Sequence, residues 1–321
     1  MAFHMYVASC VPDGGIYHYI CENGQLREVS KTDVDRPMYL ALSGNRLYAV
    51  LREPFVDDPN SGVCYWEIDA DGNLLQQSDI ISTGGRCGCH LTVEQDRIYV
   101  ANYLSGSLCM LPEGKLVTHS GSGVHPTRQE APHVHFVGFT PDQKWLLAVD
   151  LGVDAIYMYS PDLQLAKPVT VPAGHGCRHL AWSEDGKYCF CVNELASSLS
   201  VLRYVQDELL LMDTISLLPG ECLDGNTAAA IRVVGESIYI SIRGCDRIVA
   251  LTHHDGVLTQ PVLVDAEGQS PRDINIYGNL LFCANENSDC VTAFQIKAGI
   301  PEFMDQRIVM PKPLCIVFRE K

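Results

Sequence analysis

An all-β protein built from a repeated unit is predicted by three observations on the sequence. Long amphipathic helices are not evident in the 321 residues, whereas short apolar and alternating runs bounded by turns recur throughout. In each unit a first strand such as PMYLAL (37–42) is followed by a turn and a second strand such as LYAVL (47–51). The first strand recurs seven times, at intervals of 42 to 51 residues. Several strands per unit at this period predict one domain over residues 1–321, a seven-bladed β-propeller.

The first strands define the blades in chain order, and a turn and a second strand follow all but the last. They are PMYLAL (37–42), GCHLTV (88–93), HVHFVGF (133–139), CRHLAW (177–182), AAIRVV (229–234), PRDINI (271–276) and PLCIVF (313–318). The chain ends soon after the seventh, whose blade therefore lacks outer strands. The segments 4–10 and 15–21 have the pattern of a second and a third strand, so we expect both termini to close blade seven. The segments 52–62 and 219–228 are predicted to be loops between strands.

Composition and charge narrow the class of protein. With 47% hydrophobic and 19% charged residues, the chain has the composition of a globular domain. Its formal net charge of −16 repels phosphate backbones and anionic membranes, so we expect neither nucleic acid nor membrane as a partner. No apolar run approaches the ~18 residues of a membrane span, and no basic signal segment opens the chain, which predicts a cytoplasmic protein.

Fourteen cysteines raise the question of disulfides or metal. In the absence of a signal segment we expect them to be reduced and to serve as small apolar residues in strands, as in YCFCV (188–192) and LFCAN (281–285). CGCH (87–90) has no second ligand pair at zinc-finger spacing, so we expect no metal there.

Charged side chains gather where the first strands begin. The residues in register are Met38, Cys89, His135, Arg178, Ala229, Arg272 and Leu314. In a propeller this position lines the central channel, so His135, Arg178 and Arg272 are expected to converge from three blades. Glu194 and Arg243 follow second strands at the same end, and Glu286 and Arg52 hold corresponding positions. The sequence thus predicts a charged rim around one channel mouth.

At this point the chain resembles a known family, the seven-bladed propeller lactonases, which includes propeller-type 6-phosphogluconolactonases and fungal carboxymuconate lactonizing enzymes. The most specific matching segments are RQEAPHVH (128–135) and RHLAW…VNEL (178–195), and the resemblance covers essentially the whole chain. It implies hydrolysis of a sugar-acid lactone in carbohydrate metabolism, with 6-phosphogluconolactone of the pentose phosphate pathway favoured. A carboxymuconate-type lactone is the alternative substrate. A non-catalytic propeller that binds a metabolite or protein is the alternative from another class.

The resemblance implies roles for particular residues. A general base must take a proton from the attacking water, and His135 and Glu194 are both candidates. Arg178 and Arg272 are expected to clamp the anionic part of a small-molecule lactone, because a guanidinium fork suits phosphate or carboxylate. We expect the substrate to contact also His133, Arg243 and Arg128, without a cofactor. The family usually has a Glu where this chain has Ala230, and VNE where it reads VLRE.

Structural interpretations of the same residues stay open. His133 and His135 are also consistent with hydrogen-bonded strand-entry residues, or with a metal site completed by Glu194 or Asp150, although nearby arginines disfavour a cation. An ion pair between Arg128 and Glu130 is a further possibility, as is a purely structural pairing of Arg178 and Arg272 with Glu194 and Glu286. His179 is expected to point away from the channel, into the packing between blades. The recurring Asn102, Asn193 and Asn285 are interpreted as structural.

Overall fold

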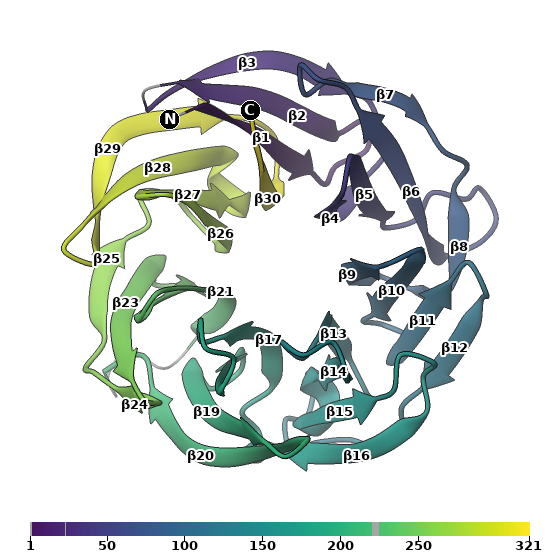
Figure 1. Cartoon of the computed structure of the whole chain (residues 1–321), viewed down its shortest axis with the longest axis vertical. Coiled ribbons are helices and arrows are strands. Elements are labelled where there is room, and N and C mark those ends of the chain that lie inside the picture. Colours follow the sequence, from purple (N-terminus) through teal and green to yellow (C-terminus); the bar gives the residue numbers. More distant parts are fainter. Residues whose placement is uncertain (1, 23, 220–224) are drawn as a thin grey trace.

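The chain forms a ring of seven antiparallel sheets around a central channel (Figure 1), in a computed structural model that describes residues 2–22, 24–219 and 225–321. Each sheet has four or five strands, and successive blades follow one another around the ring. The seven-bladed propeller is therefore confirmed. The predicted loop at 219–228 lies partly outside the described residues, at 220–224. The predicted loop at 52–62 is shorter than expected, because strand pairing begins at Asn60.

The strands fall into four positions from the channel outward. The innermost are β4 (Pro37–Ser43), β9 (Gly88–Glu94), β13 (Val134–Phe139), β17 (Cys177–Trp182), β21 (Thr227–Val234), β26 (Pro271–Tyr277) and β30 (Pro313–Glu320). The second are β5 (Arg46–Leu51), β10 (Arg97–Asn102), β14 (Leu146–Asp150), β18 (Tyr188–Asn193), β22 (Ser237–Arg243), β27 (Leu280–Asn285) and β1 (Ala2–Ser9). The third are β6 (Asn60–Ile68), β11 (Ser107–Leu111), β15 (Ala155–Tyr159), β19 (Ser198–Val205), β23 (Arg247–His254), β28 (Cys290–Lys297) and β2 (Gly15–Glu22). The outer ones are β7 (Leu74–Gln77), β8 (Ile81–Arg86), β12 (Lys115–Thr118), β16 (Leu165–Thr170), β20 (Glu208–Ser216), β24 (Val257–Leu258), β25 (Val262–Asp265), β29 (Ile300–Val309) and β3 (Gln25–Thr32). Two short 3-10 helices, η1 (Leu151–Val153) and η3 (Glu286–Ser288), complete the described elements. None of the helices in the described residues is long and apolar enough to cross a membrane.

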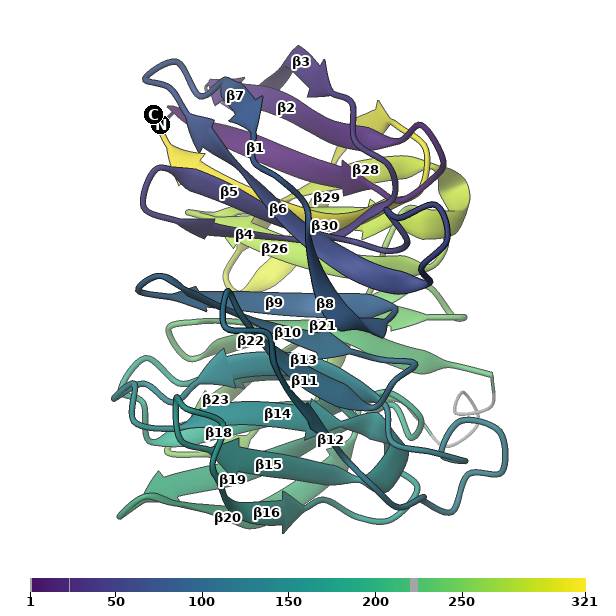
Figure 2. The ribbon, with the colours of Figure 1, turned by 90° about the vertical axis from the view of Figure 1, so that its right-hand side faces the viewer.

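Blade seven is assembled from both ends of the chain, as predicted. Its strand order is β3-β2-β1-β30, and β1 pairs antiparallel with β30 from Phe3 opposite Glu320 onward. The N- and C-termini consequently lie side by side (Figures 1 and 2). The ring of Phe3 meets that of Phe318 edge-on at 5.3 Å, so apolar packing adds to the backbone ladder. The outer strand β3 is an addition that the sequence pattern did not indicate.

Apolar side chains from facing sheets fill the spaces between blades. Between blades two and three, the Tyr99 ring meets the Phe139 ring edge-on at 5.3 Å. Cys189, Cys191 and Cys283 are fully buried within strands, which confirms their prediction as small core residues.

Every innermost strand carries a β-bulge at the position predicted to line the channel. In β13, Val134 pairs with Asp150 and Phe136 with Val149, so His135 is the extra residue. The same shift leaves one extra residue in each of the other six strands; in β21 Ala229 and Ala230 share one place opposite Ser241. A bulge bends the strand and redirects a side chain, and it recurs here at the residues that surround the channel.

Buried amides fix the loops that follow the second strands. The Asn193 side chain donates to the hydroxyls of Ser198 and Ser200, both at 2.9 Å. Asn102 and Asn285 donate in the same way to the hydroxyls of Ser107 and Thr292 in their own blades, and Asn102 also accepts from the Thr83 hydroxyl of blade one. These residues are fully buried and lie away from the channel cavity, which supports their structural interpretation.

Candidate active site

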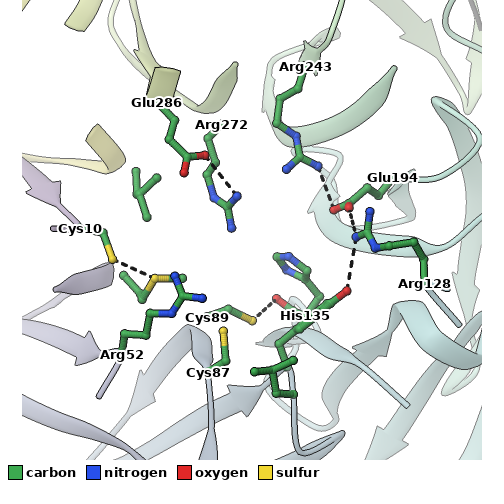
Figure 3. A pocket seen from close by; sticks show the side chains of 14 residues that line it. Cys10, Arg52, Cys87, Cys89, Arg128, His135, Glu194, Arg243, Arg272 and Glu286 are labelled. Atoms are coloured by element: carbon green, nitrogen blue, oxygen red, sulfur yellow. Dashed lines mark hydrogen bonds and ion pairs between the residues drawn. The ribbon is translucent and has the colours of Figure 1, made fainter. Parts of the chain in front are cut away.

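A cavity of about 350 Å³ opens at one mouth of the channel (Figure 3). Five of the seven predicted channel residues line it: Met38, Cys89, His135, Arg272 and Leu314. Arg128, Glu194 and Arg243 reach it from the loops and second strands, together with Arg52 and Glu286. The structure therefore brings together most of the rim that the sequence predicts.

Arg178 lies one layer deeper than this cavity. It lines a second, water-sized cavity of about 10 Å³ below, along with His135 and Arg272. Its side chain is buried, with Nε donating to a Glu194 carboxylate oxygen at 2.9 Å and Nη1 to the Ala229 carbonyl at 2.7 Å. Burial lowers the pKa of Arg178 to about 10, with the Glu194 charge opposing that shift, so the guanidinium stays protonated at neutral pH.

Glu194 is the centre of the ion-pair network. It is only 2% exposed and meets three guanidinium groups: Arg178 at 2.9 Å, Arg243 at 3.1 Å and Arg128 at 2.5 Å. Burial alone would raise the pKa of its carboxyl, but Arg243, Arg178 and the other cations nearby hold that pKa well below its usual value. Both carboxylate oxygens are occupied, so Glu194 is ionised and fully engaged.

His135 lies at the floor of the cavity as a neutral imidazole. Burial, reinforced by the positive charge of Arg178, keeps its pKa well below the ordinary 6.5. Its Nδ1 atom is buried without a hydrogen-bond partner in the described residues, and its ring meets the Tyr103 ring edge-on at 5.5 Å. An unprotonated imidazole at a cavity wall is able to accept a proton at neutral pH.

The remaining arginines differ in how completely they are paired. Arg243 lies within ion-pair distance of Glu194, yet neither its Nε nor its Nη2 makes a hydrogen bond of good geometry to any described residue. Arg272 approaches Glu286 at 3.4 Å. Arg128 donates to Glu194 and, at 3.3 Å, to the Tyr103 hydroxyl, so the alternative ion pair with Glu130 does not form. Both Arg243 and Arg272 line the cavity with partly exposed side chains, so each has donor groups available there.

His133 faces away from the cavity. Its ring stacks on that of Tyr103 at 4.4 Å, Nδ1 lies 3.1 Å from the Tyr103 carbonyl, and Nε2 lies 3.4 Å from a Glu130 carboxylate oxygen. The backbone amide of His133 donates to Asp150. These contacts match the interpretation of His133 as a hydrogen-bonded residue at the strand entry. In the described part of the chain, no three His, Cys, Asp or Glu side chains are grouped so as to hold a metal ion.

The direction predicted for His179 is wrong. Instead of packing between blades, it lines the lower cavity, with ring centroids 5.2 Å from those of His90 and His135 and 6.2 Å from that of Tyr39 across the channel. The bulge at Arg178 is the cause: with one residue added to the strand, Arg178 and His179 both face inward.

Sequence reasoning did not identify Cys10, Cys87 and Tyr103 as cavity residues. Tyr103 directly follows Asn102, at the position that Glu194 holds after Asn193, so register was the available signal. Ala230, where the family usually has a Glu, is fully buried and packs against apolar residues of blade six.

A ring of seven blades with a charged cavity at one mouth defines the class of protein, a β-propeller with a cavity of small-molecule size at its axis. The family model described as "Lactonase, 7-bladed beta-propeller" matches residues 4–318, and the chain belongs to this family. A protein of Bacillus subtilis named 6-phosphogluconolactonase is 29% identical over 308 residues, covering 88% of this chain and 87% of that protein. An uncharacterized protein of Staphylococcus saprophyticus is 30% identical over 335 residues, 95% of each chain. The crystal structure of a putative 6-phosphogluconolactonase from Bacteroides fragilis superposes with a TM-score of 0.89 at 26% identity, covering 99% of this chain and 98% of that one.

Proposed function

We propose that this protein is a carboxylic ester hydrolase that opens an anionic sugar-acid lactone, with 6-phosphogluconolactone the favoured substrate. The observation that carries the proposal is the charge of the cavity. Arg52, Arg128, Arg243 and Arg272 line it against Glu194 and Glu286, so four guanidinium groups face two carboxylates and two positive charges are in excess. In a chain of formal net charge −16, a local excess of this sign favours an anionic small molecule. The proposed reaction is a step of the pentose phosphate pathway, in the cytoplasm.

The geometry favours His135 over Glu194 as the general base. His135 is neutral and lines the cavity, whereas Glu194 has a lowered pKa and both oxygens engaged by arginines. In this mechanism His135 takes a proton from water as its oxygen attacks the lactone carbonyl carbon. The ring C–O bond then breaks, and the proton passes to the alcohol oxygen that leaves.

Arg243 is suited to stabilise the oxyanion that develops during this attack. Its side chain lines the cavity and is 16% exposed, so part of the guanidinium is available to a substrate oxygen. The Glu194 carboxylate forms ion pairs with both Arg243 and the more deeply buried Arg178. Arg178 therefore acts through Glu194 as a positioning residue, rather than as the direct clamp that the sequence suggested.

A carboxymuconate-type lactone is the second candidate. The wall opposite Glu194 contains Cys10, Met38, Cys89 and Leu314, which offer few hydrogen bonds to sugar hydroxyls. A less hydroxylated lactone would fit such a wall.

The first test is the rate of 6-phospho-δ-gluconolactone hydrolysis by the purified protein, corrected for spontaneous ring opening. We expect His135→Ala to lower kcat by ~10²-fold or more, the usual contribution of a general base. Arg178→Ala should also lose activity, and His254→Ala, at an exposed turn of blade five, serves as the matched control. A wild-type rate equal to the background would reject this substrate. If carboxymuconolactone were also unaffected, the protein would be a non-catalytic binder.

A further inference from the structure

Arg52 differs from the other arginines of the cavity in having no carboxylate partner. Its side chain is exposed and points into the cavity from blade one (Figure 3), and none of the described side chains pairs with it. Arg128 and Arg243 are both held by Glu194, and Arg272 lies beside Glu286. An unpaired guanidinium in a substrate cavity is a charge still available to a ligand.

The backbone of Arg52 is held firmly between two blades. Its amide donates to the Arg36 carbonyl at 3.1 Å, and its own carbonyl accepts from the Ser61 hydroxyl at 2.8 Å. The Ser61 oxygen in turn accepts from the Gly88 amide of blade two at 2.7 Å. The guanidinium therefore extends from a fixed point on the rim and needs to order only its own side chain on binding a ligand.

The wall between Arg52 and Arg272 includes two thiols, those of Cys10 and Cys87, while the Glu286 carboxylate lies beside Arg272. Burial raises the pKa of Cys10 to about 11 and also raises the pKa of Cys87, so both thiols stay protonated. Arg52 and Arg272 line the same cavity as these two thiols, and Figure 3 shows both guanidinium groups pointing into it. Arg52 and Arg272 thus face one region of the cavity, on the side away from Glu194.

We infer that Arg52 and Arg272 together bind a terminal oxyanion of the substrate, a phosphate or a carboxylate, and that Arg52 selects charged over neutral lactones. The inference rests on the proposed function for the identity of the reacting ring, but it concerns the other end of the molecule. The ring lies beside His135 and Arg243, while the oxyanion reaches across the neutral sulfur-lined wall to blades one and six. Two planar guanidinium forks suit an oxyanion better than ammonium groups would.

The test compares three open sugar acids that differ only at C6: gluconate has a hydroxyl there, 6-phosphogluconate a phosphate and glucarate a carboxylate. Their dissociation constants are measured by calorimetry for wild type, Arg52→Gln and Arg52→Lys, with Arg27→Gln on the outer strand β3 as a charge-matched control. We expect Arg52→Gln to weaken 6-phosphogluconate by ~10- to 100-fold, the range for hydrogen bonds to charged groups, with little change for gluconate. Arg52→Lys should recover part of the loss, and Arg27→Gln should bind like wild type.

The glucarate arm identifies the preferred oxyanion. Glucarate binding that falls in parallel with 6-phosphogluconate assigns the subsite to oxyanions in general, and an effect on 6-phosphogluconate alone assigns it to phosphate. Unchanged binding of both 6-phosphogluconate and glucarate by Arg52→Gln would overturn the inference, as would a wild-type protein that binds neither. Because binding needs no turnover, a protein that hydrolyses no lactone but shows these differences would retain the subsite and reject only the proposed reaction.

Discussion

At the residue scale, the charges of the site are organised around Glu194, whose carboxylate forms ion pairs with three guanidinium groups. The buried Glu194 carboxylate offsets part of the free-energy cost of removing the charges of Arg178 and Arg243 from water. Those two arginines in turn keep Glu194 ionised. The sequence placed Glu194 and the arginines on one rim but left two candidate bases. The choice between His135 and Glu194 as the base depends on distances and burial. A sequence does not reveal whether a carboxylate contacts three cations or only one.

The lowered pKa of His135 predicts how the lactonase activity depends on pH. Because the folded protein disfavours the charged imidazole, His135 stays an unprotonated base below its ordinary pKa of 6.5. We expect kcat/KM to keep its value as the pH falls from 7.5 through 6.5 and to decline only at distinctly lower pH. Neutral δ-gluconolactone is the substrate to use, since it has no phosphate that titrates in this range. A decline centred at 6.5 would contradict a buried neutral base.

At the scale of elements, the predicted register was right and the predicted strand geometry was incomplete. The repeat placed His135, Arg178 and Arg272 on the channel because strand starts recur at one point of each unit. The bulge that accompanies each of them adds one residue to one strand of a pair, and a single sequence does not reveal its pairing partner. For this reason His179 was assigned to the wrong side of β17. Cys87 was missed because it lies in the turn before β9, which the repeat does not place, whereas Cys10 follows the second strand of blade seven as Tyr103 follows that of blade two.

The buried amide that ends β18 connects strand geometry to the site. Asn193→Ala removes two hydrogen bonds to serine hydroxyls and loosens the residue before Glu194. We expect a loss of about 1–3 kcal/mol in the free energy of unfolding, together with a marked loss of lactonase activity. Ser183→Ala is the matched control, since it removes two hydrogen bonds at the turn between β17 and β18 of the same blade and does not line the cavity.

Both variants should show similar shifts in denaturant unfolding, but only Asn193→Ala should lose most of its kcat/KM. Equal losses of activity would mean that Asn193 acts on overall stability alone and does not position Glu194.

On the scale of the whole molecule, the charge of the cavity is opposite in sign to that of the chain. The chain has a formal net charge of −16, while the cavity at the axis gathers an excess of guanidinium groups from several blades. An anionic ligand needs such a local cluster, because the chain as a whole repels it. The ring closure makes it possible, because residues as distant in sequence as Arg52 and Arg272 reach one cavity only when blade seven joins blades six and one.

Because the ring closes through β30, we predict that folding of the whole chain depends strongly on this last strand. Deleting residues 313–321 removes β30, which leaves β1 with an open edge and exposes the apolar faces that Leu314 and Ile316 cover. We expect this truncated chain to aggregate or to lose its cooperative thermal transition, as followed by gel filtration and circular dichroism. Deleting Lys321 alone is the control: it removes only an exposed ion pair with Glu22, which water screens, and should leave the transition unchanged. A synthetic peptide of residues 313–321 should restore folding by adding the missing strand to β1. A truncated chain that stays monomeric and melts cooperatively without the peptide would show that six blades and an open seventh are sufficient for the ring.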